Sequence, residues 1–361
     1  MFTTVHVIVN RYSHYRGISH RLVVMEVSRT VPTIADVAAI AGVSHQTVSR
    51  VLNNHPSVSA KTRQKVREAI TQLGYRRNLA ARTLATGNSL IIGVLVTRTN
   101  LSGPSGSLLA IEQTARSKGY WVSMAGLQFG HPEEVTGVIS HFIDQGVDGI
   151  IAVAQTQTAV DATLKASGGM PTVLVTSGKV PDGLPTVDVD QAGGAHQAMT
   201  ILKGLGHTHI AHVSGPSGDL HAETRAAAWR EALPPSAADT AIRIEGDWSP
   251  WSGYCAAMSL LALDDLPTAI FAANDHMAFG VLRALHERGL KVPQEISVVG
   301  FDDIQGADCT IPPLTTIHQD HHGLGQAAME LILDAFEGRP ARSFKIPAQL
   351  IVRSSTGVPN R

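Results

Sequence analysis

Cysteine and long apolar runs are scarce in this chain, and each scarcity excludes a class of protein. Only Cys255 and Cys309 are present among 361 residues, too few for a disulfide framework or a thiolate metal site, so we expect both to be reduced and packed. No segment approaches the roughly 20 consecutive apolar residues that a membrane span needs. The length favours two or three domains without a membrane anchor.

Net charge is also low, at −1 overall, but it is unevenly distributed. Residues 31–90 contain eight Lys/Arg and two Asp/Glu, residues 1–30 are at +3, and residues 91–361 are near −10. A small basic head on an acidic core predicts binding of nucleic acid through the head. Residues 1–30 lack a small-residue cleavage site, so we expect no signal peptide. We expect this extension to be disordered or never translated, with Met25 or a nearby codon as the true start.

Residues 31–77 have the signals of a helix-turn-helix domain. Thr33 is a suitable N-cap with Asp36 three positions later, Gly42 suits the end of the first helix, and Ser44 caps the second. Apolar residues recur at helical spacing in both segments, and a third helix is expected between Ser59 and residue 74. The pattern predicts a second helix whose N-terminal turn enters a major groove. The alternative is a small three-helix bundle with a solvated polar face.

The outward side chains of that second helix have the chemistry of base readout. Gln46 has an amide that can pair with adenine, and Arg50 has a guanidinium suited to guanine. His45 can donate to a base edge or a phosphate. Phosphate contacts are expected from three hydroxyl residues, Ser44, Thr47 and Ser49.

A short segment, 78–89, links the head to the rest of the chain. Its residues 78–84 are too few to hold a helix alone. They can fold when a partner chain and DNA are present, with Asn78 at the start, small Ala81 allowing close approach and Leu84 wedging a minor groove. The alternative is a plain linker.

Residues 90–361 alternate short apolar runs with helical patterns, which predicts parallel sheets covered by helices. The apolar runs IIGVLV, WVSMAGL, GIIAVA and TVLVT form a first set of buried strands, and HIAHV, TAIFAA and ISVVGF form a second. GPSG follows the first strand of each set, at 103–106 and 215–218. Two related halves with a ligand at the strands' carboxyl ends are therefore expected. The expected helices lie near 108–118, 133–145, 159–167, 194–205, 222–233, 253–263, 277–288 and 323–338.

The motifs TIADVAAIAGVSHQTVSRVLN, VSAKTRQKV, NLAARTLA, ANDHMA and ISVVGFDD, in this order, resemble the LacI/GalR family of bacterial transcription repressors. The resemblance implies a homodimer on a pseudo-palindromic operator, located in the cytoplasm with the nucleoid, and hinge helices ordered by binding. It also implies a periplasmic-binding-protein-like core of two doubly wound parallel-sheet subdomains and no cofactor. The first subdomain would comprise about 90–189 plus 321–347, and the second about 190–318 plus 348–361. Because no leucine heptad tail follows, we expect a dimer rather than a tetramer.

Candidate ligand residues lie at the expected strand ends. Asn274 and Asp302 follow apolar strands and can bind paired hydroxyls, Arg225 offers a five-donor fork, and Trp248 offers a face for a sugar ring. With Gln319, they match the sugar-contacting positions of the family, whereas capping or structural roles are preferred for the adjacent Asp275 and Asp303. The wall facing the aglycone would include Thr97, Leu101, Gly103 and Ser107.

The expected effector is a small sugar, a galactoside or related glycoside, that controls operator affinity allosterically. The first half departs from the family pattern at four places: Val153, Thr176-Ser177, Val189 and His321. The departures leave the identity of the sugar open, and another sugar, a phosphosugar, a nucleoside or a corepressor is the alternative. Retained Asp302 argues against a phosphate, because like charges repel.

Other classes of protein fit less well. A solute receptor would lack the head, and an enzyme lacks support because Gly204-Leu-Gly206 has no third glycine and no G-x-S-x-G motif occurs. His207, His209 and His212 suggest a metal only weakly, because residues so spaced across a loop and strand more often pack or face solvent.

Overall fold

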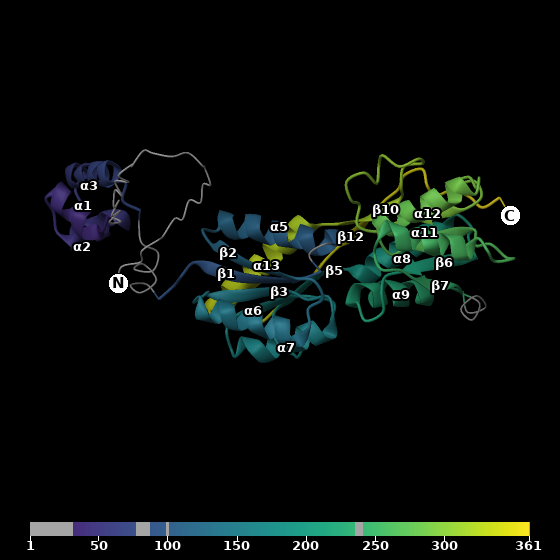
Figure 1. Ribbon diagram of the computed structural model, residues 1–361, viewed down its shortest axis with the longest axis horizontal. Helices are drawn as coiled ribbons and strands as arrows, with labels where there is room; N and C mark the ends of the chain where they lie inside the picture. Colours follow the sequence, from purple (N-terminus) through teal and green to yellow (C-terminus); the bar gives the residue numbers. More distant parts are fainter. Residues whose placement is uncertain (1–31, 77–86, 99–100, 235–240, 361) are drawn as a thin grey trace, which may run out of the picture. The chain divides into compact units, whose positions relative to one another are not determined.

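The computed structural model describes residues 32–76, 87–98, 101–234 and 241–360, which belong to two compact units (Figure 1). The first unit contains the helical head, and the second is the core, beginning at Thr83. The expected extension at 1–30 and the proposed DNA contacts Asn78, Ala81 and Leu84 lie outside the described residues.

The head consists of three helices, α1 (Ile34–Ala41), α2 (His45–Leu52) and α3 (Ala60–Leu73). Thr33 and Asp36 form a capping box at α1, which satisfies donors that the first helical turn leaves free. The helix ends at Gly42 in the left-handed conformation, with φ of 66°, which costs glycine little. Ser44 caps α2 by accepting a hydrogen bond from the backbone amide of Thr47 at 3.2 Å. The predicted helix-turn-helix is confirmed.

Burial in the head separates a core face from a readout face. Val37, Val48 and Val66, one from each helix, are fully buried. On α2 the side chains of His45, Gln46 and Arg50 are exposed, and those of Thr47 and Ser49 are partly exposed. The helix therefore presents the predicted polar face to solvent.

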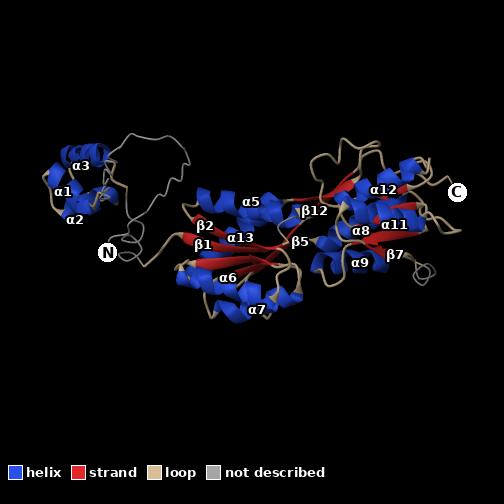
Figure 2. Cartoon of the chain, in the orientation of Figure 1, coloured by secondary structure: helices blue, strands red, loops and turns tan. Residues whose placement is uncertain are grey.

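The first half of the core is a parallel six-stranded sheet with strand order β11-β5-β4-β3-β1-β2. Helices α5 and α13 cover one face and α6 and α7 the other (Figure 2). The strands are β1 (Ile91–Thr97), β2 (Trp121–Leu127), β3 (Gly149–Val153), β4 (Thr172–Val175), β5 (Thr186–Val189) and β11 (Ser343–Ile346). The helices are α5 (Ser102–Ser117), α6 (Pro132–Asp144), α7 (Gln157–Ser167) and α13 (His321–Phe336).

The second half is a parallel four-stranded sheet with order β7-β6-β8-β9. Successive residues of β8 point to opposite faces, so that Phe271 packs in the cluster with α8 and α9, and Ile270 in the cluster with α11 and α12. An antiparallel pair, β10 (Thr316–Gln319) with β12 (Ala348–Ile351), completes the core. The second-half strands are β6 (Ile210–Ser214), β7 (Arg243–Glu245), β8 (Ala269–Ala272) and β9 (Ser297–Val299). The helices are α8 (Gln191–Gly204), α9 (Leu220–Ala232), α11 (Pro250–Leu260) and α12 (Asp275–Glu287).

Several expectations about local structure were wrong. Helix α5 begins at Ser102 rather than near residue 108, so the first GPSG lies within a helix, whereas the second lies before α9. Strand β2 is not buried but forms a sheet edge, with Trp121 64% exposed. Cys255 and Cys309 are free, as expected, but both are exposed rather than packed. In the part of the chain that the structure describes, every helix is too short or too polar to cross a bilayer.

Candidate functional site

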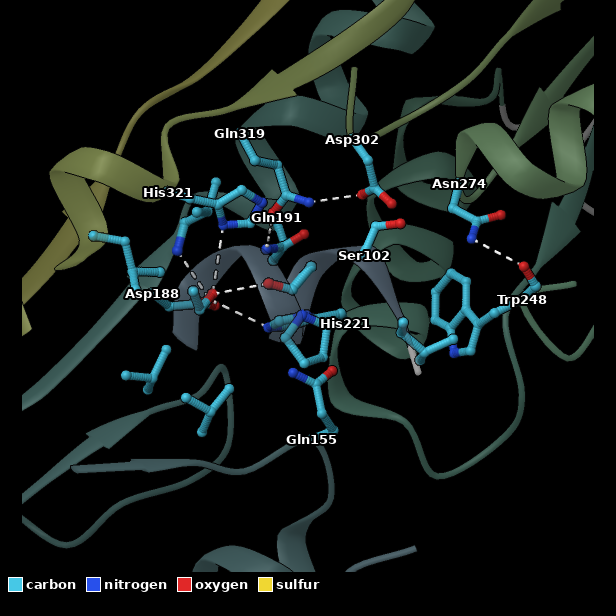
Figure 3. A pocket seen from close by; sticks show the side chains of 18 of the residues that line it. Ser102, Gln155, Asp188, Gln191, His221, Trp248, Asn274, Asp302, Gln319 and His321 are labelled. Atoms are coloured by element: carbon cyan, nitrogen blue, oxygen red, sulfur yellow. Dashed lines mark hydrogen bonds and ion pairs between the residues drawn. The ribbon is translucent and has the colours of Figure 1, made fainter. Parts of the chain in front are cut away.

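A cleft of about 530 Å³, including its opening to solvent, lies at the carboxyl ends of strands from both halves (Figure 3). Eight of the nine predicted ligand residues line the cleft: Leu101, Gly103, Ser107, Arg225, Trp248, Asn274, Asp302 and Gln319.

A hydrogen-bonded ring of four side chains, Arg225, Gln191, Gln319 and Asp302, forms one end of the cleft. Arg225 Nε donates to Gln191 Oε1 at 2.9 Å, and Gln191 Nε2 donates to Gln319 Oε1 at 3.0 Å. Gln319 Nε2 donates to Asp302 Oδ1 at 2.6 Å, and that oxygen lies 3.5 Å from the guanidinium NH1 of Arg225. Because each member orients the next, the ring presents Asp302 Oδ2, which accepts no hydrogen bond within the described chain, in a fixed position.

The ring contains a buried ion pair. Burial raises the pKa of Asp302, and the positive charge of Arg225 opposes that rise. Burial likewise lowers the pKa of Arg225, which the carboxylate of Asp302 opposes. The guanidinium also stacks 3.6 Å from the ring centroid of Phe301 and donates to the carbonyl of Ala273. Removing either charge would leave the other buried without its partner, which is costly.

Trp248 and Asn274 form the adjoining wall. Asn274 caps α12 by accepting from the amide of Met277 at 2.9 Å, and its Nδ2 donates to the carbonyl of Trp248 at 3.1 Å. The indole packs so closely on Gly215 that a Cβ there would lie 2.3 Å from the ring. Its Nε1 is buried and has no hydrogen-bond partner among the described residues. Trp248 therefore offers an apolar face and an unused donor to a ligand.

The backbone is in sparsely populated conformations at two of the lining positions. Trp248 has a φ of 75° and Asp302 a φ of 112°, both unusual for residues with side chains. Such strain commonly occurs where a side chain must be aimed at a ligand.

Thr97 does not line the cleft. It is 1% exposed, its hydroxyl donates to the carbonyl of Val153 at 3.2 Å, and it accepts from the amide of Gln155 at 3.2 Å. It therefore fixes the end of β3. Leu101, by contrast, lines the cleft at the N-cap position of α5.

The structural interpretation of Asp275 and Asp303 agrees with their contacts. Asp275 is fully buried and accepts from the amide of Ile304 at 2.9 Å and the hydroxyl of Thr316 at 2.6 Å. Burial raises the pKa of Asp275 to about 8. Asp303 accepts from Arg353 at 2.7 Å and pairs with His318 at 3.1 Å. Neither residue lines the cleft.

Sequence reasoning missed five polar residues of the cleft, among them Gln191 in the ring and Asp188 and His221 on the opposite wall. Asp188 Oδ1 lies 3.2 Å from His221 Nε2, and Asp188 Oδ2 accepts from Ser177. Burial lowers the pKa of His221, but the nearby carboxylates, Asp188 first, outweigh burial and raise it. Two signals were available in the sequence: a carboxylate within the apolar strand TVDV, and a histidine four residues before Arg225 on one helix face. The missed polar lining residues are Ser102, Gln155, Asp188, Gln191 and His221.

The three histidines considered for metal binding have separate environments, and His209 lies 3.6 Å from the carboxylate of Asp265. His212 stacks between Trp229 and Phe271, and burial lowers its pKa to about 3. His207 contacts the hydroxyls of Thr268 and Ser297 at 2.9 and 3.0 Å. Within the described residues, no group of three or more His, Cys, Asp or Glu side chains has a geometry that could hold a metal ion.

Comparison with known proteins identifies relatives along almost the whole chain. Residues 33–78 match the model of bacterial regulatory proteins of the lacI family, and residues 186–356 match a periplasmic binding protein-like domain. The lactose operon repressor of Escherichia coli K12 is 36% identical over 331 residues, which cover 91% of each chain. The repressor PurR of Histophilus somni 129Pt is 32% identical over 90% of this chain and 98% of that protein.

Solved structures agree with these matches. The lac repressor dimer bound to operator and the anti-inducer ONPF superposes with a TM-score of 0.82 at 36% identity, over 90% of this chain and 99% of that one. The complex of the regulator CelR with cellobiose has a TM-score of 0.66 at 29% identity, with the same coverage. On fold, site and relatives together, the chain belongs to the lacI family of bacterial regulatory proteins, as a transcription regulator with a helix-turn-helix head and a ligand-binding core, and not as an enzyme.

Proposed function

We propose that this protein is a repressor that binds a pseudo-palindromic operator as a homodimer and whose operator affinity is set by a small sugar in the cleft. The exposed polar face of α2 supports the first part, with Gln46 and Arg50 reading bases and Ser44, His45, Thr47 and Ser49 placed to contact the phosphates or a base edge. A relative at 36% identity is described as a dimer bound to operator. Residues 78–84 would order between the two heads, and the protein would act in the cytoplasm on the nucleoid.

The hydrogen-bonded ring is the observation that carries the effector class. A sugar presents vicinal hydroxyls that both donate and accept, and Asp302 beside Arg225 supplies an acceptor and donors at fixed positions. Trp248 supplies the apolar surface that one face of a pyranose needs, and Asn274 a further amide. A galactoside or related glycoside suits this combination.

Anionic effectors fit the cleft less well. Asp302 and Asp188 place a carboxylate at each end of the cleft, and either would repel a phosphate. A different neutral effector, such as another sugar or a nucleoside, is the alternative within the same family. The structural relative bound to cellobiose favours a sugar over a nucleoside.

The control would operate through closure of the cleft. Arg225 and His221 lie on α9 in the second half, whereas Asp188 belongs to β5 in the first. A ligand that contacts both walls stabilises one relative arrangement of the halves, and any effect on operator binding must be reciprocal, typically by about 1–3 kcal/mol.

The test is a thermal-shift screen of the purified protein against mono- and disaccharides, sugar phosphates and nucleosides, followed by operator binding measured by fluorescence anisotropy. We expect at least one galactoside or glucoside to raise the melting temperature and to change operator affinity about 5- to 150-fold. If only phosphorylated or nucleoside compounds stabilise the protein, the sugar assignment fails. If no duplex is bound above the background of random DNA, the repressor assignment fails.

A further inference from the structure

The two halves of the core contact each other beside the cleft, at the first turn of α9. The backbone amide of Leu220 on α9 donates to the carbonyl of Gln155, which follows β3 in the first half, at 2.9 Å. Next to this bond, Nε of Arg98, which follows β1, lies 4.0 Å from Oδ2 of Asp219, the N-cap of α9. Figure 3 shows Gln155 at the cleft wall beside His221. We call these contacts between the first turn of α9 and the first half the α9 junction.

Each half also packs a leucine against the apolar cluster of the other half. Leu220 of the second half packs against the first-half cluster that contains Leu95, and a Cβ on Gly178 would lie 3.0 Å from its Cδ1. Leu101 of the first half packs against the second-half cluster that contains Trp248. Because these contacts remove apolar surface from water, they favour the arrangement in which the two halves touch.

The charged groups of the α9 junction are buried but incompletely hydrogen-bonded. Within the described residues, five polar side-chain atoms are buried without a hydrogen-bond partner, and three of them lie here: Arg98 Nε, Asp219 Oδ2 and His221 Nε2. The other oxygen of Asp219 accepts from the amides of His221 and Ala222, both at 3.1 Å. Its Oδ2 is 4.0 Å from Arg98, which is beyond hydrogen-bond distance. Water would complete these bonds if the two halves separated.

The α9 junction therefore combines effects of opposite sign. Apolar burial and the backbone hydrogen bond hold the halves together, whereas the desolvation of charged groups favours their separation. Arg98 also has a φ of 56°, in the left-handed region, and such strain is typical of positions where a side chain must be aimed. A contact whose stability is the difference between opposing effects is suited to opening and closing.

We propose that the α9 junction is a latch that controls access to the cleft, so that it must open before a ligand can enter or leave. Arg98, Asp219 and Leu220 do not line the cleft, so they would act on ligand exchange without touching the ligand. A looser latch should speed entry and exit together. The proposal does not depend on which ligand the cleft binds.

Thiol accessibility tests the proposal without a known ligand. Ser107 lines the cleft and is 5% exposed, so Ser107→Cys introduces a thiol there. The exposed Cys255 and Cys309 are first replaced by serine. The rate at which methyl methanethiosulfonate modifies the introduced thiol, followed by mass spectrometry of the full-length protein, measures opening of the cleft. Hydrogen–deuterium exchange of the Leu220 amide, resolved to single residues, measures opening of the latch in the same protein.

Two substitutions loosen the latch by different means. Arg98→Met leaves the buried Asp219 without the guanidinium that faces it, and we expect both rates to rise together by about three- to tenfold. Leu220→Ala shortens the apolar contact without changing a charge. After correction for the intrinsic exchange rate, it should raise both rates to a similar extent, and it carries the test if Arg98→Met fails to fold.

Matched variants separate the latch from a general loss of stability. Arg116→Met is the control, because Arg116 lies in the same half but pairs with Glu112 within α5, and it should change neither rate. Asp219→Asn keeps an oxygen for the helix cap. Combined with Arg98→Met, it should return both rates toward those of the native protein, because no buried charge is then left unpaired.

Three results would overturn the proposal. Unchanged rates in Arg98→Met and Leu220→Ala would show that the α9 junction is not a latch. Faster exchange of the Leu220 amide with unchanged modification of the thiol would show that its opening does not admit molecules to the cleft. Equal acceleration of amides in buried strands such as β8 would indicate general loosening instead. Because no ligand is used, a failure of the sugar assignment would leave these outcomes unaffected.

Discussion

The neighbouring carboxylates Asp302 and Asp303 provide the sharpest test of the site. Replacing Asp302 by Asn retains an oxygen for Gln319 to donate to but removes the charge 3.5 Å from the Arg225 guanidinium. Arg225 is 3% exposed and would lose its nearest compensating carboxylate. Breaking a buried pair costs about 3–5 kcal/mol, and the retained hydrogen bond should hold the loss in the free energy of unfolding to about 2–4 kcal/mol.

The same substitution removes a charged acceptor from the ligand. A hydrogen bond to a charged group contributes about 1.5–3 kcal/mol, so sugar affinity should fall by about 10- to 150-fold. Asp303→Asn is the matched control, because Asp303 pairs with Arg353 and His318 outside the cleft. It should cost stability but change sugar affinity less than threefold. Urea unfolding and calorimetric titration of both variants measure the two effects.

One pattern of results would refute this reasoning. If Asp302→Asn bound the sugar as the native protein does, and Asp303→Asn did not, the ligand would contact the outer carboxylate and the ring would be purely structural. A protein whose stability was unchanged by Asp302→Asn would show that the Arg225 charge is compensated elsewhere.

Three further predictions concern protonation, stacking and DNA readout. Burial raises the pKa of Asp275 in the folded state to about 8, from an ordinary value of 3.8. Between these two pH values the folded protein keeps a proton that the unfolded chain releases. The free energy of unfolding therefore falls as the pH rises from about 4 to 8. In urea unfolding at several pH values, Asp275→Asn should show a smaller decrease in the free energy of unfolding with pH. At pH 8 this variant should be more stable than the native protein by on the order of 2–4 kcal/mol. An unchanged dependence of stability on pH would assign the effect to another group. Trp248→Phe removes an unpaired indole donor, so it should change the melting temperature little but weaken sugar binding about three- to tenfold in calorimetry, and equal affinity would exclude a bond to the indole. Arg50→Ala should cost about 1–3 kcal/mol at one operator base pair in anisotropy assays with single-base variants, whereas loss spread evenly over all sequences would indicate a phosphate contact, as expected for the control Arg67→Ala on α3.

Local signals were sufficient to predict the head. The caps at Thr33, Ser44 and Ser59 and the left-handed glycines at 42 and 74 all occur where the sequence places them. Helix caps and left-handed glycines interact with residues within about four positions in the sequence, so they can be predicted without knowledge of the tertiary structure. The role of Arg63 was harder to predict from the sequence, because its guanidinium donates a hydrogen bond across a turn to the carbonyl of His55 at 3.0 Å.

The core was predictable where strands are continuously apolar and not where they are short or polar. Strand β5, with the sequence TVDV, lies between β4 and β11, and strand β11, with SFKI, pairs with β5, so both depend on sheet pairing rather than on local pattern. The same limit applied to the site. Asn274 and Asp302 follow apolar strands and were found, whereas Gln191 and Asp188 became site residues only because β5 and α8 bring them beside α9.

The hydrogen-bonded ring also constrains how a protein of this kind can acquire a new effector. Each side chain of the ring makes a hydrogen bond with another. A substitution at Gln191 or Gln319 therefore leaves a buried polar group without its hydrogen-bond partner, which lowers the free energy of unfolding. Among the residues that the structure describes, the side chains of Ser102 and Gln155 make no hydrogen bond that holds a neighbour in place. Divergence among descendants should therefore accumulate at these two positions first, altering which ligand is recognised while the Asp302 end of the cleft is inherited unchanged.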